Sequence, residues 1–105
     1  MKRRDVVWTA EAARELFEII EGIFRASGYR RTADRYEERL LDTVARIGLV
    51  AEAGRKRDDL APGLRTWAFD RKFIIAYRIL GERVRIVRVF DGRRDYPRLF
   101  GKRPR

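Results

Sequence analysis

The order of two hydrophobic periodicities along the chain constrains its fold most. Apolar residues recur at every third or fourth position in the front half, as in amphipathic helices, and the back half holds short runs dense in β-branched and aromatic residues, as in strands. The helix pattern covers residues 10–26 and 33–47, and the strand pattern covers residues 6–8, 64–69, 73–80 and 84–90. We therefore predict an α+β fold in which an N-terminal strand and a helical hairpin pack on an antiparallel β-sheet, with the first strand at an edge.

Single residues mark the expected ends of the helices. Thr9 can accept a hydrogen bond from the first turn of the first helix, and Thr32 can do the same for the second. Ser27 and Gly28 are expected to end the first helix, and Gly48 is expected to end the second.

Two segments follow neither periodicity. Residues 50–63 carry turn formers and an Arg-Lys-Arg run, and we interpret them as a long surface connection whose Pro62-Gly63 pair forms a type II turn. Residues 91–105 are polar and basic, and the last five, 101–105, are expected to fray. The candidate anchors in this last segment are Tyr96, Leu99 and Phe100.

The composition favours one domain and removes most familiar catalytic sites. With 105 residues, of which 45% are hydrophobic, we expect a single domain over residues 1–105 with its core at about residues 6–100. The sequence has no cysteine and no histidine, which excludes thiol and imidazole chemistry and the commonest zinc ligands. No apolar run reaches the ~20 residues of a membrane span, and no signal-peptide core is present, so we expect a cytoplasmic protein without membrane contact.

The positive charge lies in the second half of the chain. The net charge is +10, from 26 basic and 16 acidic residues. Residues 1–53 hold equal numbers of the two kinds, whereas residues 54–105 hold 16 basic and 6 acidic residues. Such a field attracts a polyanion or an acidic protein surface. Arginine predominates over lysine, and its planar guanidinium suits two-pronged recognition of carboxylate or phosphate.

Candidate catalytic and metal-binding motifs are few. The adjacent carboxylates Asp58 and Asp59 lie in a loop among basic residues, and we interpret them as solvated charge. The sequence has no phosphate-binding glycine loop and no nucleophile motif, and its one serine, Ser27, lies in a predicted turn. We therefore expect neither a metal nor a cofactor.

A basic constellation in the second half is the strongest candidate site. Its members are Arg65, Arg71, Lys72, Arg78, Arg85, Arg88, Arg93, Arg94 and Arg98. Antiparallel pairing can gather many of them on one surface, where they would recognise phosphate or carboxylate or stabilise charge during RNA cleavage. The alternative is a solvated sheet face whose arginines pair with Asp91 and Asp95. Tyr77 is expected in the core, whereas Tyr96 suits either stacking on a base or donating a proton.

Short motifs spread over residues 6–100 carry a resemblance to a known family. They are Trp8-Thr9-Ala10-Glu11-Ala12 before a helix with Leu16 and Ile20, residues 33–40, Gly54-Arg55, Pro62-Gly63-Leu64-Arg65, residues 73–78, residues 84–89 and Gly92-Arg93-Arg94-Asp95. In this order they resemble the ParE branch of the RelE/ParE toxins of bacterial type II toxin-antitoxin systems. The element order expected from the periodicity agrees with the fold of that family.

The resemblance implies a small toxin that a cognate antitoxin silences by wrapping its C-terminal segment around it as a helix and an extended strand. ParE-like toxins poison DNA gyrase and block DNA replication without a catalytic step, whereas RelE-like relatives cut mRNA in the ribosome. The expected antitoxin contacts are Leu16, Ile20, Tyr36, Leu40, Arg78, Arg85 and Arg88. The expected target contacts are Arg65, Arg71, Lys72, Arg93 and Arg94.

One departure from the family pattern bears on the choice between these activities. Family members often carry histidine before the glycine of the closing motif, but this sequence has Asp91 there, and a carboxylate would repel phosphate. We therefore predict a gyrase poison that is not an enzyme. The alternative, an mRNA endoribonuclease, would use Arg65, Arg71, Lys72, Arg93 and Tyr96. A third hypothesis is a nucleic-acid-binding module without toxicity, or a degenerate toxin.

Overall fold

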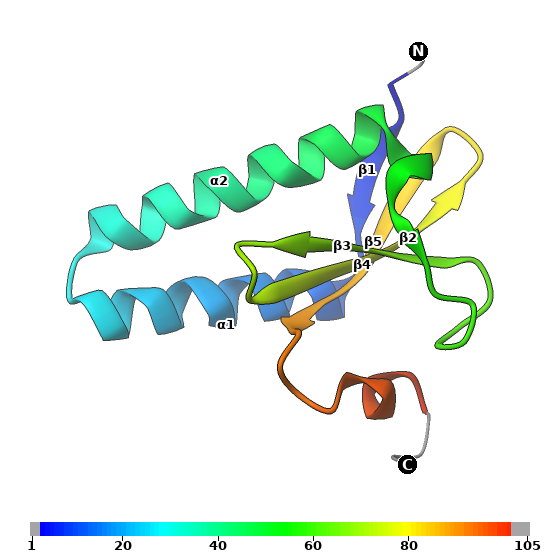
Figure 1. The fold of residues 1–105 in the computed structure, drawn as a ribbon. Coiled ribbons are helices and arrows are strands. Elements are labelled where there is room, and N and C mark those ends of the chain that lie inside the picture. Colours follow the sequence, from blue (N-terminus) through cyan, green and yellow to red (C-terminus); the bar gives the residue numbers. More distant parts are fainter. Residues whose placement is uncertain (1–2, 102–105) are drawn as a thin grey trace.

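Two antiparallel helices form one layer of the molecule, and a five-stranded sheet forms the other (Figure 1). The computed structural model describes residues 3–101. In chain order the elements are β1 (Asp5–Trp8), α1 (Ala10–Ser27), α2 (Arg30–Leu49), the 3-10 helix η1 (Ala51–Ala53), β2 (Arg55–Lys56), β3 (Leu64–Phe69), β4 (Phe73–Leu80), β5 (Arg83–Asp91) and the 3-10 helix η2 (Tyr96–Phe100). The helices cover one face of the sheet, and residues of η2 pack against the other face.

The strands lie in the order β1-β5-β4-β3-β2. β1 lies at an edge, as predicted, but it runs parallel to β5, whereas the other three strand pairs are antiparallel. The sheet is therefore mixed rather than fully antiparallel, because β1 at its edge runs in the same direction as its neighbour β5. The α+β class is confirmed, and the four strands predicted from the sequence agree with the observed ones to within one residue at each end.

Thr9 caps α1, as its position before the helix predicted. Its Oγ1 accepts a hydrogen bond from the Ala12 N–H at 3.0 Å and donates one to the Val87 carbonyl at 2.9 Å. The same side chain therefore begins the helix and joins it to β5. Within the described part of the chain, neither helix is long and apolar enough to cross a bilayer.

α1 ends as predicted, but α2 begins earlier. Gly28 follows α1 with a φ of 80°, a left-handed conformation that suits glycine. The prediction that Thr32 caps α2 is wrong, because the helix begins at Arg30. Tyr29 precedes it without a side-chain capping bond. The tight reversal at Gly28 brings the chain back into helical conformation two residues before Thr32.

Gly48 lies inside α2 and does not end it, contrary to the prediction. The helix continues to Leu49, and the buried Gly48 carbonyl accepts a hydrogen bond from the Arg4 N–H at 2.9 Å. A Cβ at this position would lie 2.9 Å from the Arg4 carbonyl oxygen and 3.2 Å from Cγ2 of Val6. This glycine therefore serves the close approach of the segment leading into β1 rather than a helix end.

Residues 50–63 are more ordered than the surface connection that the sequence predicted. They contain η1 and the two-residue strand β2, which pairs with the start of β3. Ala51 and Leu60 are buried. The predicted turn at Pro62-Gly63 does form, because the residue before it accepts a hydrogen bond from the residue after it at 3.1 Å, and Gly63 has a φ of 74°.

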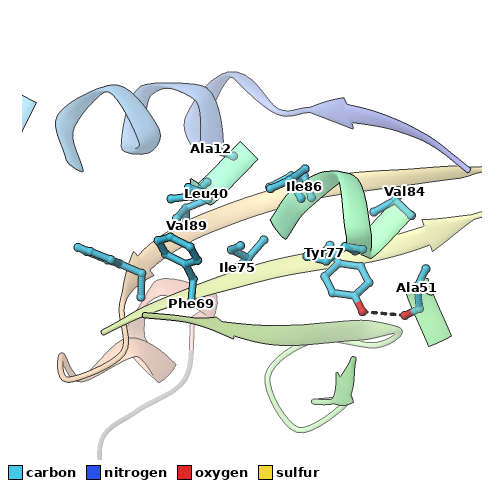
Figure 2. Close-up of a cluster of buried hydrophobic side chains, with 12 residues drawn as sticks. Ala12, Leu40, Ala51, Phe69, Ile75, Tyr77, Val84, Ile86 and Val89 are labelled. Atoms are coloured by element: carbon cyan, nitrogen blue, oxygen red, sulfur yellow. Dashed lines mark hydrogen bonds between the residues drawn. The ribbon is translucent and has the colours of Figure 1, made fainter. Parts of the chain in front are cut away.

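The main core lies between the helices and the sheet (Figure 2). Its fully buried members include Ala12, Leu40, Ile47, Ile75, Tyr77, Val84 and Ile86. Tyr77 lies in the core, as predicted, and its hydroxyl donates a hydrogen bond to the Ala51 carbonyl at 2.7 Å (Figure 2). That bond satisfies the polar end of an otherwise apolar contact between β4 and η1.

A smaller core covers the opposite face of the sheet. Its buried members are Leu60, Leu64, Ala76 and Phe90, and the anchors predicted in the last segment, Tyr96, Leu99 and Phe100, pack against them. β4 is thus covered on both faces over part of its length, which agrees with the apolar residues at successive positions in its first half. Of the predicted frayed tail, only Gly101 lies within the described residues.

The contact between Gly54 and Tyr77 gives a stability prediction. A Cβ on Gly54 would overlap the Tyr77 hydroxyl oxygen and lie 2.7 Å from Cζ. We expect Gly54→Ala to lower the free energy of unfolding by about 3 kcal/mol, because the ring cannot move without losing its bond to Ala51. Urea unfolding measures the effect. Gly22→Ala, where a Cβ meets nothing within 4 Å, is the control and should not destabilise the protein; equal stabilities of the two variants would contradict the packing.

Candidate functional site

Four of the predicted target contacts come together at one end of the sheet. These residues, which we call the sheet-end cluster, are Arg71, Lys72, Arg93 and Arg94. The cluster forms because β4 and β5 pair as far as Phe73 and Asp91, so the turn before β4 lies beside the segment after β5. The Gly92 N–H donates a hydrogen bond to the Lys72 carbonyl at 2.8 Å and joins the two segments.

The turn that carries half of this cluster is held in a strained conformation. Asp70 and Arg71 both have a φ of 55°, a region that disfavours residues with a side chain. The Tyr36 hydroxyl of α2 donates to Oδ2 of Asp70 at 2.8 Å, and Arg39 lies 3.6 Å from Oδ1. Burial, followed by this hydrogen bond to the Asp70 carboxylate, raises the pKa of Tyr36 above its ordinary value. These contacts fix the turn to α2.

In the other half of the cluster, one arginine is paired and its neighbour is not. Arg93 binds the Asp91 carboxylate with two side-chain hydrogen bonds of 2.9 and 2.7 Å, and its backbone N–H adds a third of 2.9 Å. Arg93 is the main reason that the pKa of Asp91 falls to about 2. Arg94 is exposed and has no carboxylate within 4.0 Å among the described residues. Asp91 thus holds Arg93 in place, and Arg94 is available to a partner.

Arg65 lies apart from the cluster. It pairs with Tyr77 across the sheet, four residues from the turn, which is about 13 Å along a strand. One Nη atom donates to the carbonyls of Glu52 and Gly54 at 2.8 and 3.1 Å. Arg65 lines a pocket of about 300 Å³ together with Lys56. The structure therefore does not bring Arg65 to the other four predicted target contacts.

Tyr96 is part of a packed network on the face that η2 covers. Its hydroxyl accepts a hydrogen bond from Arg57 at 2.9 Å, and its ring lies 5.2 Å from that of Phe90. Arg57 donates in turn to Asp59 at 2.9 and 2.8 Å, so this carboxylate, which was predicted to be solvated charge, binds a neighbouring arginine. Of the five residues of the alternative endoribonuclease, Arg71, Lys72 and Arg93 thus lie in the sheet-end cluster, whereas Arg65 lies apart and Tyr96 carries a structural hydrogen bond.

The predicted antitoxin contacts differ in accessibility. Leu40 is fully buried and Ile20 nearly so, because both face the core of the hairpin. Leu16 and Tyr36 are half-buried and keep some surface open to a partner. In this conformation Leu40 therefore belongs to the core rather than to a contact surface.

Arg88 has an internal partner that no sequence pattern indicates. Its guanidinium binds the Glu15 carboxylate of α1 at 3.1, 3.1 and 2.9 Å, and Glu15 also accepts from the Val89 N–H at 3.0 Å. The side chains are only 18% and 15% exposed. The carboxylate raises the pKa of Arg88. This predicted antitoxin contact therefore joins α1 to β5, and its spacing of 73 residues from Glu15 left no local signal.

The acidic residues of the described chain do not form a metal site. No group of three or more carboxylates within residues 3–101 could hold an ion. Several of them instead pair with arginines. As the alternative interpretation of the basic constellation expected, Asp91 pairs with Arg93 at 2.7 Å and Asp95 pairs with Arg98 at 3.0 Å.

Comparisons with known proteins agree with this fold. The family model of the ParE toxin of type II toxin-antitoxin system, parDE, matches residues 6–96. The chain is 30% identical over 98 residues to Toxin ParE3 of Caulobacter vibrioides. This match covers 93% of this chain and 96% of that protein. A chain of a solved structure, described as the chromosomal ParDE TA system from P. aeruginosa, matches with a TM-score of 0.73 and 26% identity, over 85% of this chain and 96% of that one. The chain therefore belongs to the ParE family of type II toxins.

The Asp91–Arg93 pair predicts a particular titration. The folded-state pKa of about 2 lies below the ~3.9 of an unperturbed aspartate, so the pair stabilises the fold above about pH 4 and is lost as the pH falls through about 2. NMR titration of the Asp91 carboxyl carbon measures this value. Arg93→Gln should move the midpoint up toward ~3.9, whereas Arg94→Gln should leave it in place. A wild-type midpoint near ~3.9 would contradict the pair.

The Glu15–Arg88 pair predicts a large stability loss. Glu15→Ala leaves the Arg88 guanidinium without its main partner and the Val89 N–H without an acceptor, so we expect the free energy of unfolding to fall by about 3 kcal/mol. Glu11→Ala is the control, because Glu11 lies 3.5 Å from Arg88 but is 59% exposed, and it should cost less than about 1 kcal/mol. Equal losses in urea unfolding would show that Glu15 has no special role.

Proposed function

We propose that this ParE-family chain poisons DNA gyrase and thereby blocks DNA replication, and that it does so in the bacterial cytoplasm without a catalytic step. The observation that carries the proposal is the family match over residues 6–96, which includes the whole sheet-end cluster. This cluster presents cations at one end of a rigid sheet. Guanidinium groups placed in this way suit recognition of carboxylates on a protein target.

The arrangement of the basic residues supports a binding role over RNA cleavage. The sequence contains no histidine or cysteine that could transfer a proton near neutral pH. Arg65 lies away from the cluster, and the Tyr96 hydroxyl is bonded to Arg57. A cut in RNA needs a proton donor and a charge stabiliser at the same phosphate, and the fold does not bring all five residues of that alternative to one place, because Arg65 lies away from the others.

A cognate antitoxin is the proposed inhibitor. The relationship to a chain of a ParDE system supports such a partner. The helical hairpin has exposed apolar side chains at Phe17 of α1 and Leu41 of α2, and the predicted contacts Leu16 and Tyr36 are half-buried. An amphipathic helix of the antitoxin would cover this surface.

Pulse-labelling after induced expression in bacteria tests the proposed target. DNA synthesis should stop within the first minutes while protein synthesis continues, and purified gyrase should then accumulate cleaved DNA in the presence of the protein. An early stop in translation would instead favour the endoribonuclease. No effect on either process would leave a silent binder or an inactive toxin.

Charge reversal tests the sheet-end cluster. The double variant Arg93→Glu/Arg94→Glu should reduce the arrest of DNA synthesis by about tenfold or more, because it replaces two cations with anions at the proposed contact. The control is Arg31→Glu/Arg35→Glu on α2, which changes the net charge equally at exposed arginines without ion pairs among the described residues. Circular dichroism verifies folding. Full toxicity in a folded Arg93/Arg94 variant would refute the site.

A further inference from the structure

The turn between β3 and β4 is built from residues that this turn geometry disfavours. The Lys72 N–H donates to the Phe69 carbonyl at 3.1 Å, so Asp70 and Arg71, each with a φ of 55°, are the two central residues of a tight turn. Positive φ at both central positions favours Asn-Gly. Every other left-handed residue in the described chain is a glycine, as is Gly81 in the turn between β4 and β5. An arginine here therefore keeps its side chain at a cost that glycine would avoid.

Tyr36 of α2 packs on both strands that this turn joins. Its ring lies edge-on, 5.4 Å from the ring of Phe69 at the end of β3 and 6.3 Å from that of Phe73 at the start of β4. Both phenylalanines are buried. The Tyr36 hydroxyl then reaches the turn itself, where it donates to Oδ2 of Asp70 at 2.8 Å. One side chain of the helix therefore contacts both strands and the turn between them.

The hydroxyl is the stronger of the two contacts that α2 makes with Asp70. Arg39 lies 3.6 Å from Oδ1 and its side chain is 60% exposed, and an ion pair of this kind contributes little to stability. The Tyr36 hydroxyl makes a short hydrogen bond to a charged acceptor, and its ring is already held by the two phenylalanines. The position of the turn therefore depends on Tyr36 more than on Arg39.

Because Asp70 is bound to α2, the charge of its neighbour Arg71 stays open. Arg71 is exposed, and no carboxylate in the described part of the chain lies within 4.0 Å of its guanidinium. Arg93 differs, because Asp91 binds it directly. A released Asp70 carboxylate would instead be drawn to the cation next to it in the chain. The Tyr36 hydroxyl thus holds the turn and also keeps an adjacent carboxylate from neutralising Arg71.

We propose that Tyr36 and Asp70 are positioning residues of the target site, which hold Arg71 in its left-handed conformation with its guanidinium directed at a carboxylate of the target. The inference rests on the proposed function, because that function supplies the target. It adds a role at this site for Tyr36, which the sequence predicted as an antitoxin contact. A cation that is held in one place before binding loses less conformational freedom when it binds.

Purified gyrase tests the positioning role. The readout is the concentration of the full chain that gives half of the maximal amount of cleaved DNA. Tyr36→Phe, which keeps the ring and removes only the hydroxyl, should raise this concentration by about fivefold. Arg71→Gln should raise it by about tenfold. The double variant should be no weaker than Arg71→Gln alone, because Tyr36 acts through Arg71.

Two further variants separate positioning from other effects of the substitutions. Asp70→Asn keeps an oxygen acceptor and tolerates the left-handed conformation, so it should stay within about twofold of the wild type. Tyr29→Phe removes a hydroxyl that has no hydrogen bond among the described residues, from a side chain that is 71% exposed, and should have no effect. A loss of about fiftyfold in the Tyr36/Arg71 double variant, or equal losses in Tyr36→Phe and Tyr29→Phe, would overturn the proposal.

NMR relaxation of the free chain gives a readout that needs no target. The order parameter of the Arg71 N–H should fall from about 0.85 in the wild type to below about 0.6 in Tyr36→Phe, and should stay high in Tyr29→Phe. Thermal unfolding verifies that each variant is folded at the temperature of the measurements. A rigid Arg71 in Tyr36→Phe would refute the positioning role alone. Absence of cleaved DNA with the wild-type chain would instead refute the proposed function.

Discussion

The pairing of β4 with β5 determines where the candidate contact surfaces of the sheet lie. Its register shifts between Ala76 and Tyr77, which leaves Val87 as the extra residue of a bulge. Because strand side chains alternate with a period of two, this residue turns Arg88 out of the main core and turns Val89 into it. After the bulge along β5, the register ends with the residue pair that supports the sheet-end cluster. Before the bulge, the register places Arg78 opposite Arg85. The bulge also offers the carbonyl that anchors the Thr9 cap.

The distribution of net charge over the surface depends on which acidic residues bind groups within the fold. Those of the second half that bind groups within the fold are Asp58, Asp59, Asp70, Asp91 and Asp95. In the first half, Glu15 binds Arg88 and Glu52 binds Arg4. Because these carboxylates bind partners within the fold, other arginines, such as Arg85 and Arg94, have no carboxylate within 4.0 Å among the described residues. The net charge of +10 is therefore unevenly compensated over the surface, which favours contact with an anionic partner.

Local patterns predicted most elements, and the misses have physical reasons. The strands and α1 were predictable because period and turn residues agree in each, and Tyr77 was predictable as core because it alternates within an apolar run. β2 carries two basic residues and no period, so only its pairing with β3 defines it. The bulge did leave a trace, since Ile86 and Val87 are consecutive apolar residues followed by Arg88. The Glu15–Arg88 pair depends on the docking of α1 beside β5, which no local pattern contains.

Two features that weaken the free chain lie among the basic residues of the sheet. The left-handed conformations of Asp70 and Arg71 cost on the order of 1 kcal/mol each, and the opposed arginines cost a few tenths more. Strain of this kind persists only where neighbouring structure enforces it, and Tyr36 and Arg39 do so at the turn. A glycine at position 71 and a polar neutral residue at position 85 would make a more stable sheet. The chain instead keeps cations at both positions, which is the arrangement expected where stability has been given up for contact with an anionic partner.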